Sequence, residues 1–288
     1  MLQIPGNPLE DATLAAYREF LERRASRFSE EYKRIVGAYG SLRSYAALHA
    51  SLGIHKTRRA DGAFSWRLRE YMPNAEALWL TTDRLNFQRH AAYRFRRLEN
   101  GIFQLTLPEN VLAHGTYMEL RVTPRSQGSG QGALRRVPAF ASWVEQDAVL
   151  PAQWCARLWA PEKPYRFRHS RPAKTVFPRI YEAHVGMAQS ALARQERSVG
   201  SYRDFTADIL PRIKAAGYTA VQLMGILEHP LYRSYGYQVS SYFAPSSRFG
   251  TPDEFRELVD AAHGLSLMVI LDIPHGHACA NTEQGIAA

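Results

Sequence analysis

The stretch that decides the fold is Ser234-Tyr-Gly-Tyr-Gln-Val-Ser-Ser-Tyr-Phe-Ala-Pro-Ser-Ser-Arg-Phe-Gly-Thr-Pro252, and Leu271-Asp-Ile-Pro-His-Gly-His277 follows it. The end of the first stretch is typical of a helix start. Thr251 can cap the helix, proline fits its first turn, and the acids that come next suit its positive end. The apolar run over 267–271 then predicts a buried strand. A helix that leads into such a strand is one unit of a fold with a parallel sheet.

The same alternation of strand and helix continues upstream of these two stretches. It predicts successive βαβ units, and hence a parallel sheet or barrel over 179–288. The proline-bearing stretch over 151–178 comes directly before the first of these strands and predicts a connecting segment. The expected strands are 179–185, 220–226 and 267–272, and the expected helices are 202–216 and 252–263.

The N-terminal half of the chain has two other patterns. In 1–52 the apolar residues recur at three- and four-residue steps, which predicts a helical segment. Residues 53–150 instead carry short runs rich in aromatic and β-branched residues, separated by turn residues, which predicts a small β-sandwich. The Gly- and Ser-rich stretch over 125–132 is expected to be a loop within this sandwich.

Composition bounds the class of protein. The chain has 288 residues, of which 45% are hydrophobic, and a formal net charge of +9. Acids lie among the scattered positive residues, so no nucleic acid partner is expected. A basic nucleic-acid-binding protein stays open as an alternative that salt-dependent retention on DNA would favour. Neither a membrane-length apolar run nor a secretory signal is found, which predicts a cytoplasmic protein with no membrane partner. Cys155 and Cys279 are expected to be reduced thiols.

Polar side chains fall where the predicted strands end. In a β/α barrel the active site forms at the carboxyl ends of the strands, where side chains leave the core. A single Glu or His at such a place is often structural, but here they occur at three successive strand ends with tyrosines nearby. This predicts a polar cleft suited to a sugar, which stacks on rings and needs hydrogen-bond partners. The residues are Glu182, His184, Glu228, His229, Asp272, His277, Tyr235 and Tyr237.

Motifs for other chemistry are weaker. His275-Gly-His277 offers two imidazoles but no third ligand at a suitable spacing, so no metal is expected. Gly236 and Gly250 do not form a phosphate-cradling motif, and Ser246-Ser247 lacks the strand, turn and helix context of a catalytic serine. The sequence therefore predicts no cofactor.

Four stretches together resemble one enzyme family. Two of them are the stretches quoted at the start, Ser234–Pro252 and Leu271–His277. The other two are Arg179-Ile-Tyr-Glu-Ala-His-Val-Gly186 and Val221-Gln-Leu-Met-Gly-Ile-Leu-Glu-His229. They are similar to the first barrel strands of glycogen and starch branching enzymes, glycosyltransferases of the α-amylase superfamily that make α-1,6 branches in α-1,4-glucans. The resemblance implies a multi-domain chain. A helical segment would be followed by an all-β, immunoglobulin-like, starch-binding sandwich and then by the first strands and helices of an incomplete (β/α)8 TIM barrel.

The resemblance also implies roles for single residues. Tyr237 would be a platform at the glucose subsite next to the bond being cut. Asp272 would be the carboxylate of the family's first conserved region, and His277 would bind a sugar hydroxyl. Glu228 and His229 would support that loop. The implied partner is an α-1,4-glucan such as glycogen, amylose or starch.

Catalysis in the family resembles that of retaining glycosidases, which need two carboxyl groups roughly 5–5.5 Å apart. In the family the nucleophile and the acid come from barrel strands that follow the third. This chain ends at Ala288, shortly after the third predicted strand. We therefore expect a chain that has no catalytic residue, is inactive alone, and exposes strand edges that reduce its solubility. A non-catalytic glucan-binding or regulatory protein is the alternative.

The sandwich departs from the family pattern at two places. Thr82-Asp-Arg-Leu-Asn-Phe87 stands where the family usually carries Gly-Asp-Phe-Asn-x-Trp, and Glu70-Tyr-Met-Pro73 replaces Glu-Trp-Ala-Pro. An aromatic residue remains at each altered ring position, so the strands can still pack. The expectation that the sandwich binds glucan is weaker as a result.

Overall fold

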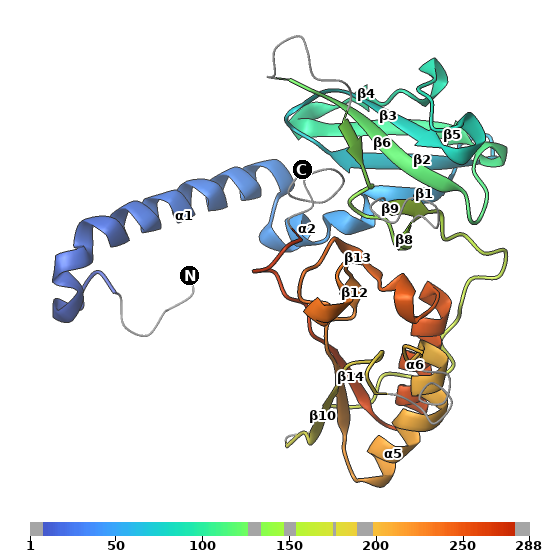
Figure 1. Cartoon of the computed structure of the whole chain (residues 1–288). Coiled ribbons are helices and arrows are strands. Elements are labelled where there is room, and N and C mark those ends of the chain that lie inside the picture. Colours follow the sequence, from blue (N-terminus) through green and yellow to red (C-terminus); the bar gives the residue numbers. More distant parts are fainter. Residues whose placement is uncertain (1–7, 126–133, 147–153, 175–176, 189–197, 280–288) are drawn as a thin grey trace. The chain divides into compact units, whose positions relative to one another are not determined.

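The computed structural model describes residues 8–125, 134–146, 154–174, 177–188 and 198–279 of the 288-residue chain. The chain divides into two compact units, Met1–Ser51 and Leu52–Ala288. Figure 1 shows the first unit as helices and the second as sheets with helices beside them.

The first unit is helical. It contains η1 (Ala12–Tyr17), α1 (Arg18–Tyr39), α2 (Leu42–Ala46) and η2 (Leu48–Ala50). The Asp11 carboxylate accepts a hydrogen bond from the backbone N–H of Thr13 at 2.8 Å, which satisfies a free donor at the start of η1. Gly40, with φ of 80°, ends α1 in a conformation that suits glycine.

The second unit begins with two antiparallel sheets. One has the strand order β1 (Gly53–Arg58), β2 (Phe64–Tyr71), β5 (Ile102–Pro108) and β4 (Arg96–Arg97). The other has the order β3 (Ala75–Thr82), β6 (Tyr117–Pro124), β9 (Trp154–Arg157) and β8 (Val144–Gln146), and β7 (Leu134–Arg136) also pairs with β6. Every second side chain of β2, β3, β5 and β6 points into one shared core, which includes Leu68, Leu78, Leu80, Phe103 and Leu120.

Strand β9 lies inside the stretch that the sequence assigns to a connection. It pairs with β6 and β8, and Trp154, Cys155 and Ala156 are all buried. The later part of that stretch is fixed to α6 (Pro252–Gly264) by the Asp260 carboxylate, which accepts hydrogen bonds from the Tyr165 hydroxyl at 2.8 Å and the His169 backbone N–H at 2.9 Å.

A parallel sheet follows in the C-terminal part of the unit. Its strands are β10 (Ile180–Ala183), β11 (Ala220–Leu223) and β14 (Met268–Leu271), side by side in chain order. Between β10 and β11 come α4 (Tyr202–Asp204), a π-helical turn at Phe205–Ile209 and α5 (Leu210–Ala215), and α6 comes before β14. The described residues contain no closed barrel.

Two helix starts in this part are fixed by reciprocal caps. The Thr251 hydroxyl accepts from the Glu254 backbone N–H, and the Glu254 carboxylate accepts from the Thr251 N–H. This confirms the predicted helix start. Ser201 and Asp204 form the same arrangement in front of α4. The helices bury Leu210 and Leu258 against the sheet in a core with Val221 and Leu223.

The middle strand is shorter than predicted. The sequence predicts a strand over 220–226, but β11 ends at Leu223 because Gly225 turns the chain with a φ of 50°. The chain then forms β12 (Leu227–Glu228), which pairs with β13 (Ser241–Pro245). The loop between β12 and β13 carries Tyr235 and Tyr237 above the carboxyl end of the parallel sheet.

Candidate functional site

Tyr237 and Asp272 are brought together at the carboxyl end of the parallel sheet. Asp272 directly follows β14, and its backbone N–H donates to the Leu223 carbonyl at 3.1 Å, so β11 fixes its position. The Tyr237 hydroxyl donates to Oδ2 of Asp272 at 2.6 Å. This hydrogen bond, followed by burial and by the charges of Asp272 and Glu182, raises the pKa of Tyr237 to about 12. Tyr237 is therefore a neutral donor at physiological pH.

A close contact between two glycines sets the direction of the Tyr237 loop. Gly236 has a φ of 82°, and a Cβ added to it would stand 1.9 Å from the Gly225 carbonyl oxygen. Tyr235, just before it, has a left-handed φ of 54°. The Tyr237 N–H then donates to the Ser234 carbonyl at 3.0 Å and closes the turn. From the sequence, Gly236 was considered only as part of a phosphate-binding motif, which it does not form. Its contact with Gly225 was not predicted.

Glu228 is fully buried beneath this loop. Its carboxylate accepts hydrogen bonds from the backbone N–H groups of His229 at 3.0 Å and Ser247 at 2.6 Å, and from the Ser246 hydroxyl at 3.3 Å. Burial raises the pKa of Glu228 to about 7, although these hydrogen bonds lower it. The carboxyl group thus joins the end of β12 to the segment that follows β13.

Two buried histidines lie next to each other in the same region. His229 has Nδ1 2.8 Å from the Leu227 carbonyl oxygen, while its Nε2 has no partner among the described residues. His184 presents the edge or face of its ring to Tyr232, Tyr235 and Phe249, and neither ring nitrogen has a partner in the described part of the chain. Burial lowers the pKa of both imidazoles. Both are therefore neutral packing groups near pH 7.

His277 lies on the exposed segment that follows β14. Its side chain is exposed, and no hydrogen bond or ion pair of the described residues joins it to Tyr237 or Asp272. Its neighbour His275 stacks on Tyr242, with ring centroids 5.6 Å apart. Glu182 is also exposed and accepts a hydrogen bond from the Gln222 side chain at 2.9 Å.

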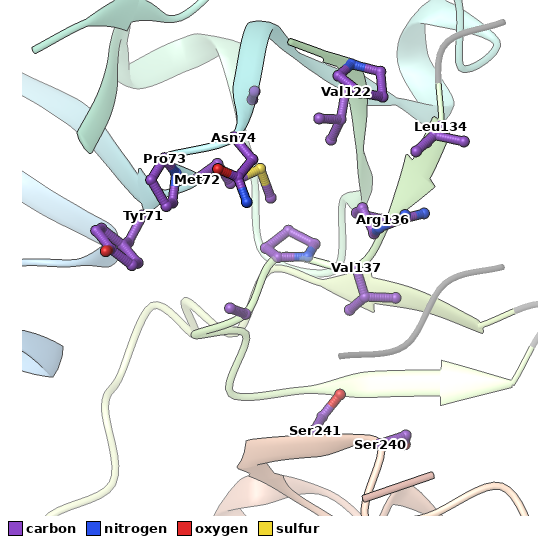
Figure 2. A pocket seen from close by; sticks show the side chains of 14 residues that line it. Tyr71, Met72, Pro73, Asn74, Val122, Leu134, Arg136, Val137, Ser240 and Ser241 are labelled. Atoms are coloured by element: carbon purple, nitrogen blue, oxygen red, sulfur yellow. The ribbon is translucent and has the colours of Figure 1, made fainter. Parts of the chain in front are cut away.

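A separate, mostly apolar pocket of about 380 Å³ lies beside the antiparallel sheets (Figure 2). Tyr71 and Pro73 from the altered sandwich motif line it together with Arg136 and Ser241. None of Tyr237, Asp272, His277, Glu228 and His229 lines this pocket. In the described ranges, no group of three His, Cys, Asp or Glu side chains is placed to hold a metal ion, and no helix is long and apolar enough to cross a membrane.

Known proteins resemble this chain over nearly its whole length. No protein-family model matches it. The 1,4-alpha-glucan-branching enzyme of Equus caballus is 38% identical over 282 residues, which cover 96% of this chain and 38% of that enzyme. The enzyme of the same name from Yarrowia lipolytica is 35% identical over 284 residues, or 96% of this chain and 39% of that one. The chain is a relative of the 1,4-alpha-glucan-branching enzymes. The resemblance that the sequence motifs indicate is confirmed.

The chain spans about two fifths of the length of these branching enzymes. Among solved structures, a putative alpha amylase from Salmonella typhimurium matches with a TM-score of 0.59 and 22% identity, over 79% of this chain and 34% of that one. A pullulanase from Bacillus acidopullulyticus also matches with a TM-score of 0.59, at 19% identity, over 79% of this chain and 30% of that one. This branching-enzyme relative therefore shares the mixed helix and sheet fold of α-amylase-family structures.

Proposed function

We propose that the chain forms part of a 1,4-α-glucan branching enzyme and binds α-1,4-glucan at Tyr237 and Asp272. The observation that carries this proposal is the hydrogen bond between the Tyr237 hydroxyl and Asp272 Oδ2 at the carboxyl end of the parallel sheet. It holds the tyrosine ring in one orientation, and a fixed aromatic face suits the C–H face of a glucose unit. The remaining lone pairs of Asp272 can accept sugar hydroxyls.

The implied reaction is a retaining double displacement. A carboxylate attacks the anomeric carbon and breaks the α-1,4 bond while a carboxylic acid protonates the leaving oxygen. The deprotonated acid then takes the proton of a glucan 6-hydroxyl, whose oxygen displaces the carboxylate to form the α-1,6 branch. In the described residues the buried Glu228 is enclosed by its hydrogen bonds and Asp272 is bound to Tyr237. We assign neither as the nucleophile, and infer that residues 1–288 bind glucan without turnover.

The proposed architecture has four parts. Residues 1–52 form a helical segment, 53–150 an immunoglobulin-like sandwich, 151–178 a connection and 179–288 the first part of a (β/α)8 barrel. Support for the sandwich comes from two antiparallel sheets that share one core. Support for the barrel comes from three parallel strands in chain order with helices between them.

The other roles in this proposal rest on position. His277, exposed on the segment after β14, would reach a sugar hydroxyl when glucan binds. Glu228 and His229 would hold the loop that carries Tyr237, as their buried hydrogen bonds suggest. We propose a cytoplasmic location, with an organelle as the alternative, since one relative is named as chloroplastic or amyloplastic.

Affinity electrophoresis of the full chain in gels that contain glycogen tests the proposal. We expect glycogen to retard the protein, and Tyr237→Ala to weaken binding about tenfold through loss of ring stacking. Tyr32→Ala, which removes an exposed tyrosine from α1, is the matched control and should bind as the parent does. Equal migration with and without glycogen would refute glucan binding.

A branching assay on the same protein separates the two candidate functions. Because no catalytic pair is assigned in the described residues, we expect no new α-1,6 linkages when the chain acts alone. Binding without branching supports either a part of the enzyme or a non-catalytic glucan-binding protein. Branching that is restored by adding the remaining portion of a related branching enzyme would favour the first of these.

A further inference from the structure

Four arginines and one tryptophan lie together on the outer face of the sheet formed by β3, β6 and β7. Strand register places Arg121 of β6 opposite Trp79 of β3 on one side and opposite Arg135 of β7 on the other. The neighbours of Arg121 along β6, Leu120 and Val122, belong to the core, so alternation points Arg121 outward. The three side chains therefore form a row across the sheet. With Arg89 and Arg94, they make up what we call the arginine patch.

Arg89 and Arg94 come from the segment that follows β3 and lie over the Trp79 ring. Their guanidinium carbons are 5.1 Å and 5.4 Å from the ring centroid, within the range of a cation–π contact. Trp79 and Arg94 also form a β-bridge, which fixes the backbone of Arg94. Both guanidinium groups are thus held in place by the ring, although both side chains remain exposed.

The positive charges of the patch are only partly balanced. Glu119, whose side chain is 3% exposed, accepts from the Arg135 side chain at 3.0 Å, and Arg121 lies 3.6 Å from the same carboxylate. Among the ion pairs of the described residues, Arg89 and Arg94 have none. Burial lowers the pKa of Arg121, Glu119 raises it, and the charges of Arg135 and Arg89 lower it further. Arg121 is therefore close enough to Arg135 and Arg89 for their positive charges to repel one another.

A shallow pocket of about 380 Å³ adjoins the patch. Arg94 lines it together with Arg96 and Arg97, and Glu76 lies in its lining as well. The pocket therefore extends the positive surface beyond Trp79 and gives a small ligand space beside Arg94.

We propose that the arginine patch binds a small, multiply charged phosphate compound. Each guanidinium presents a planar fork of N–H donors that matches two phosphate oxygens, and an anion would relieve the repulsion between the arginines. The rings and ion pairs that hold the arginines reduce the side-chain entropy lost on binding. A nucleic acid is disfavoured because guanidinium groups already occupy the Trp79 ring on which a base would stack. The site is separate from Tyr237 and Asp272, so it stands independently of glucan binding.

Calorimetric titration of the full chain with pyrophosphate tests the proposal. We expect saturable binding that weakens as salt concentration rises. The double variant Arg89→Gln and Arg94→Gln removes two exposed charges without disturbing the core, and should bind pyrophosphate at least about tenfold more weakly. Arg58→Gln removes one exposed arginine from β1, in the other sheet, and should bind as the parent does.

A second variant and a second ligand complete the test. Arg121→Gln should also weaken pyrophosphate binding about tenfold while far-ultraviolet circular dichroism confirms the fold. Absence of binding, or an equal loss in Arg58→Gln, would overturn the proposal. So would tight binding of short single-stranded DNA that the double variant loses to the same extent, since the patch would then be a general polyanion surface.

Discussion

The backbones of Gly225 and Gly236 touch, and a Cβ on either residue would overlap the other segment. A Cβ on Gly225 would stand 1.7 Å from the Tyr235 carbonyl oxygen and 2.8 Å from the Gly236 Cα. Both glycines have positive φ angles, 50° and 82°. The end of β11 and the loop that carries Tyr237 are thus held against each other by backbone atoms.

Gly236→Ala is expected to destabilise the fold by about 2 kcal/mol or more, because it adds both an overlap and an unfavourable φ. Urea unfolding followed by circular dichroism measures this change. The control is Gly37→Ala in α1, where a Cβ meets nothing within 4 Å and alanine should stabilise the helix by about 0.5–1 kcal/mol. Equal stability of Gly236→Ala and the parent would show that the two backbones do not touch.

Asp260→Asn is expected to detach the connection from α6. The buried carboxylate accepts from Tyr165, from the backbone N–H groups of Arg168 and His169, and from the His169 ring. Burial alone would raise the pKa of Asp260, but these hydrogen bonds outweigh it and hold the pKa below its usual range. Replacement by the neutral amide should cost about 2 kcal/mol of folding free energy.

The pH dependence provides a second check on Asp260. Because its folded pKa is lowered, its contribution is complete above the ordinary aspartate pKa of 3.8 and is lost as pH falls below that value. The difference in stability between parent and Asp260→Asn should therefore shrink in acid. The exposed Asp61, replaced by Asn, is the control and should change stability by less than about 0.5 kcal/mol. A difference that stays constant down to pH 3 would contradict this assignment.

Local sequence signals predicted the parts of the fold that depend on local chemistry. Thr251 and Glu254 cap α6 within one turn, and the apolar run before Asp272 forms a strand, because caps and periodicity act over a few residues. The sequence predicted that Tyr237 and Asp272 line one cleft, but it did not predict a hydrogen bond between them. Their direct hydrogen bond depends on the glycine contact beneath them, which no spacing in the sequence reveals.

Long-range contacts account for what the sequence did not predict. Asp260 meets Tyr165 across 95 positions of the chain, so neither residue signals the other. The arginine patch depends on the register of β6 against β3 and β7, whereas in the sequence its members look like scattered surface charges. His277 was grouped with Asp272 by its position, yet only the aspartate is tied to the sheet by a backbone hydrogen bond.

Glu228 should make the fold less stable as pH rises toward neutrality. Burial raises its folded pKa to about 7 from the ordinary 4.5, so the folded state holds a proton that the unfolded state releases between these values. Stability from this group is complete below about pH 4.5 and declines up to about pH 7. In Glu228→Gln the part of this decline that comes from Glu228 should disappear. The buried Glu70, whose pKa burial raises to about 8, should still lower the stability as pH rises.

Unfolding free energies of parent and Glu228→Gln, measured from pH 4 to pH 8, give the contribution of Glu228 by difference. The exposed Glu76, replaced by Gln, serves as the control and should leave the pH profile of the parent unchanged. Parallel profiles for the parent and Glu228→Gln would mean that Glu228 is not the group that titrates.

Asp272→Asn should lower the pKa of Tyr237 from about 12 toward the ordinary value of 10, because the hydrogen bond to the carboxylate is the largest cause of the rise. The amide oxygen can still accept the hydroxyl proton, but it no longer carries the charge that opposes ionisation of the phenol. NMR titration with labelled tyrosine rings measures the change, and Tyr237→Phe assigns the signal. Glu182→Gln is the matched control, since Glu182 is the smallest cause of the rise and should move the pKa far less. If Glu182→Gln lowered the Tyr237 pKa as much as Asp272→Asn does, the ring would be held by general negative charge and not by one directed hydrogen bond.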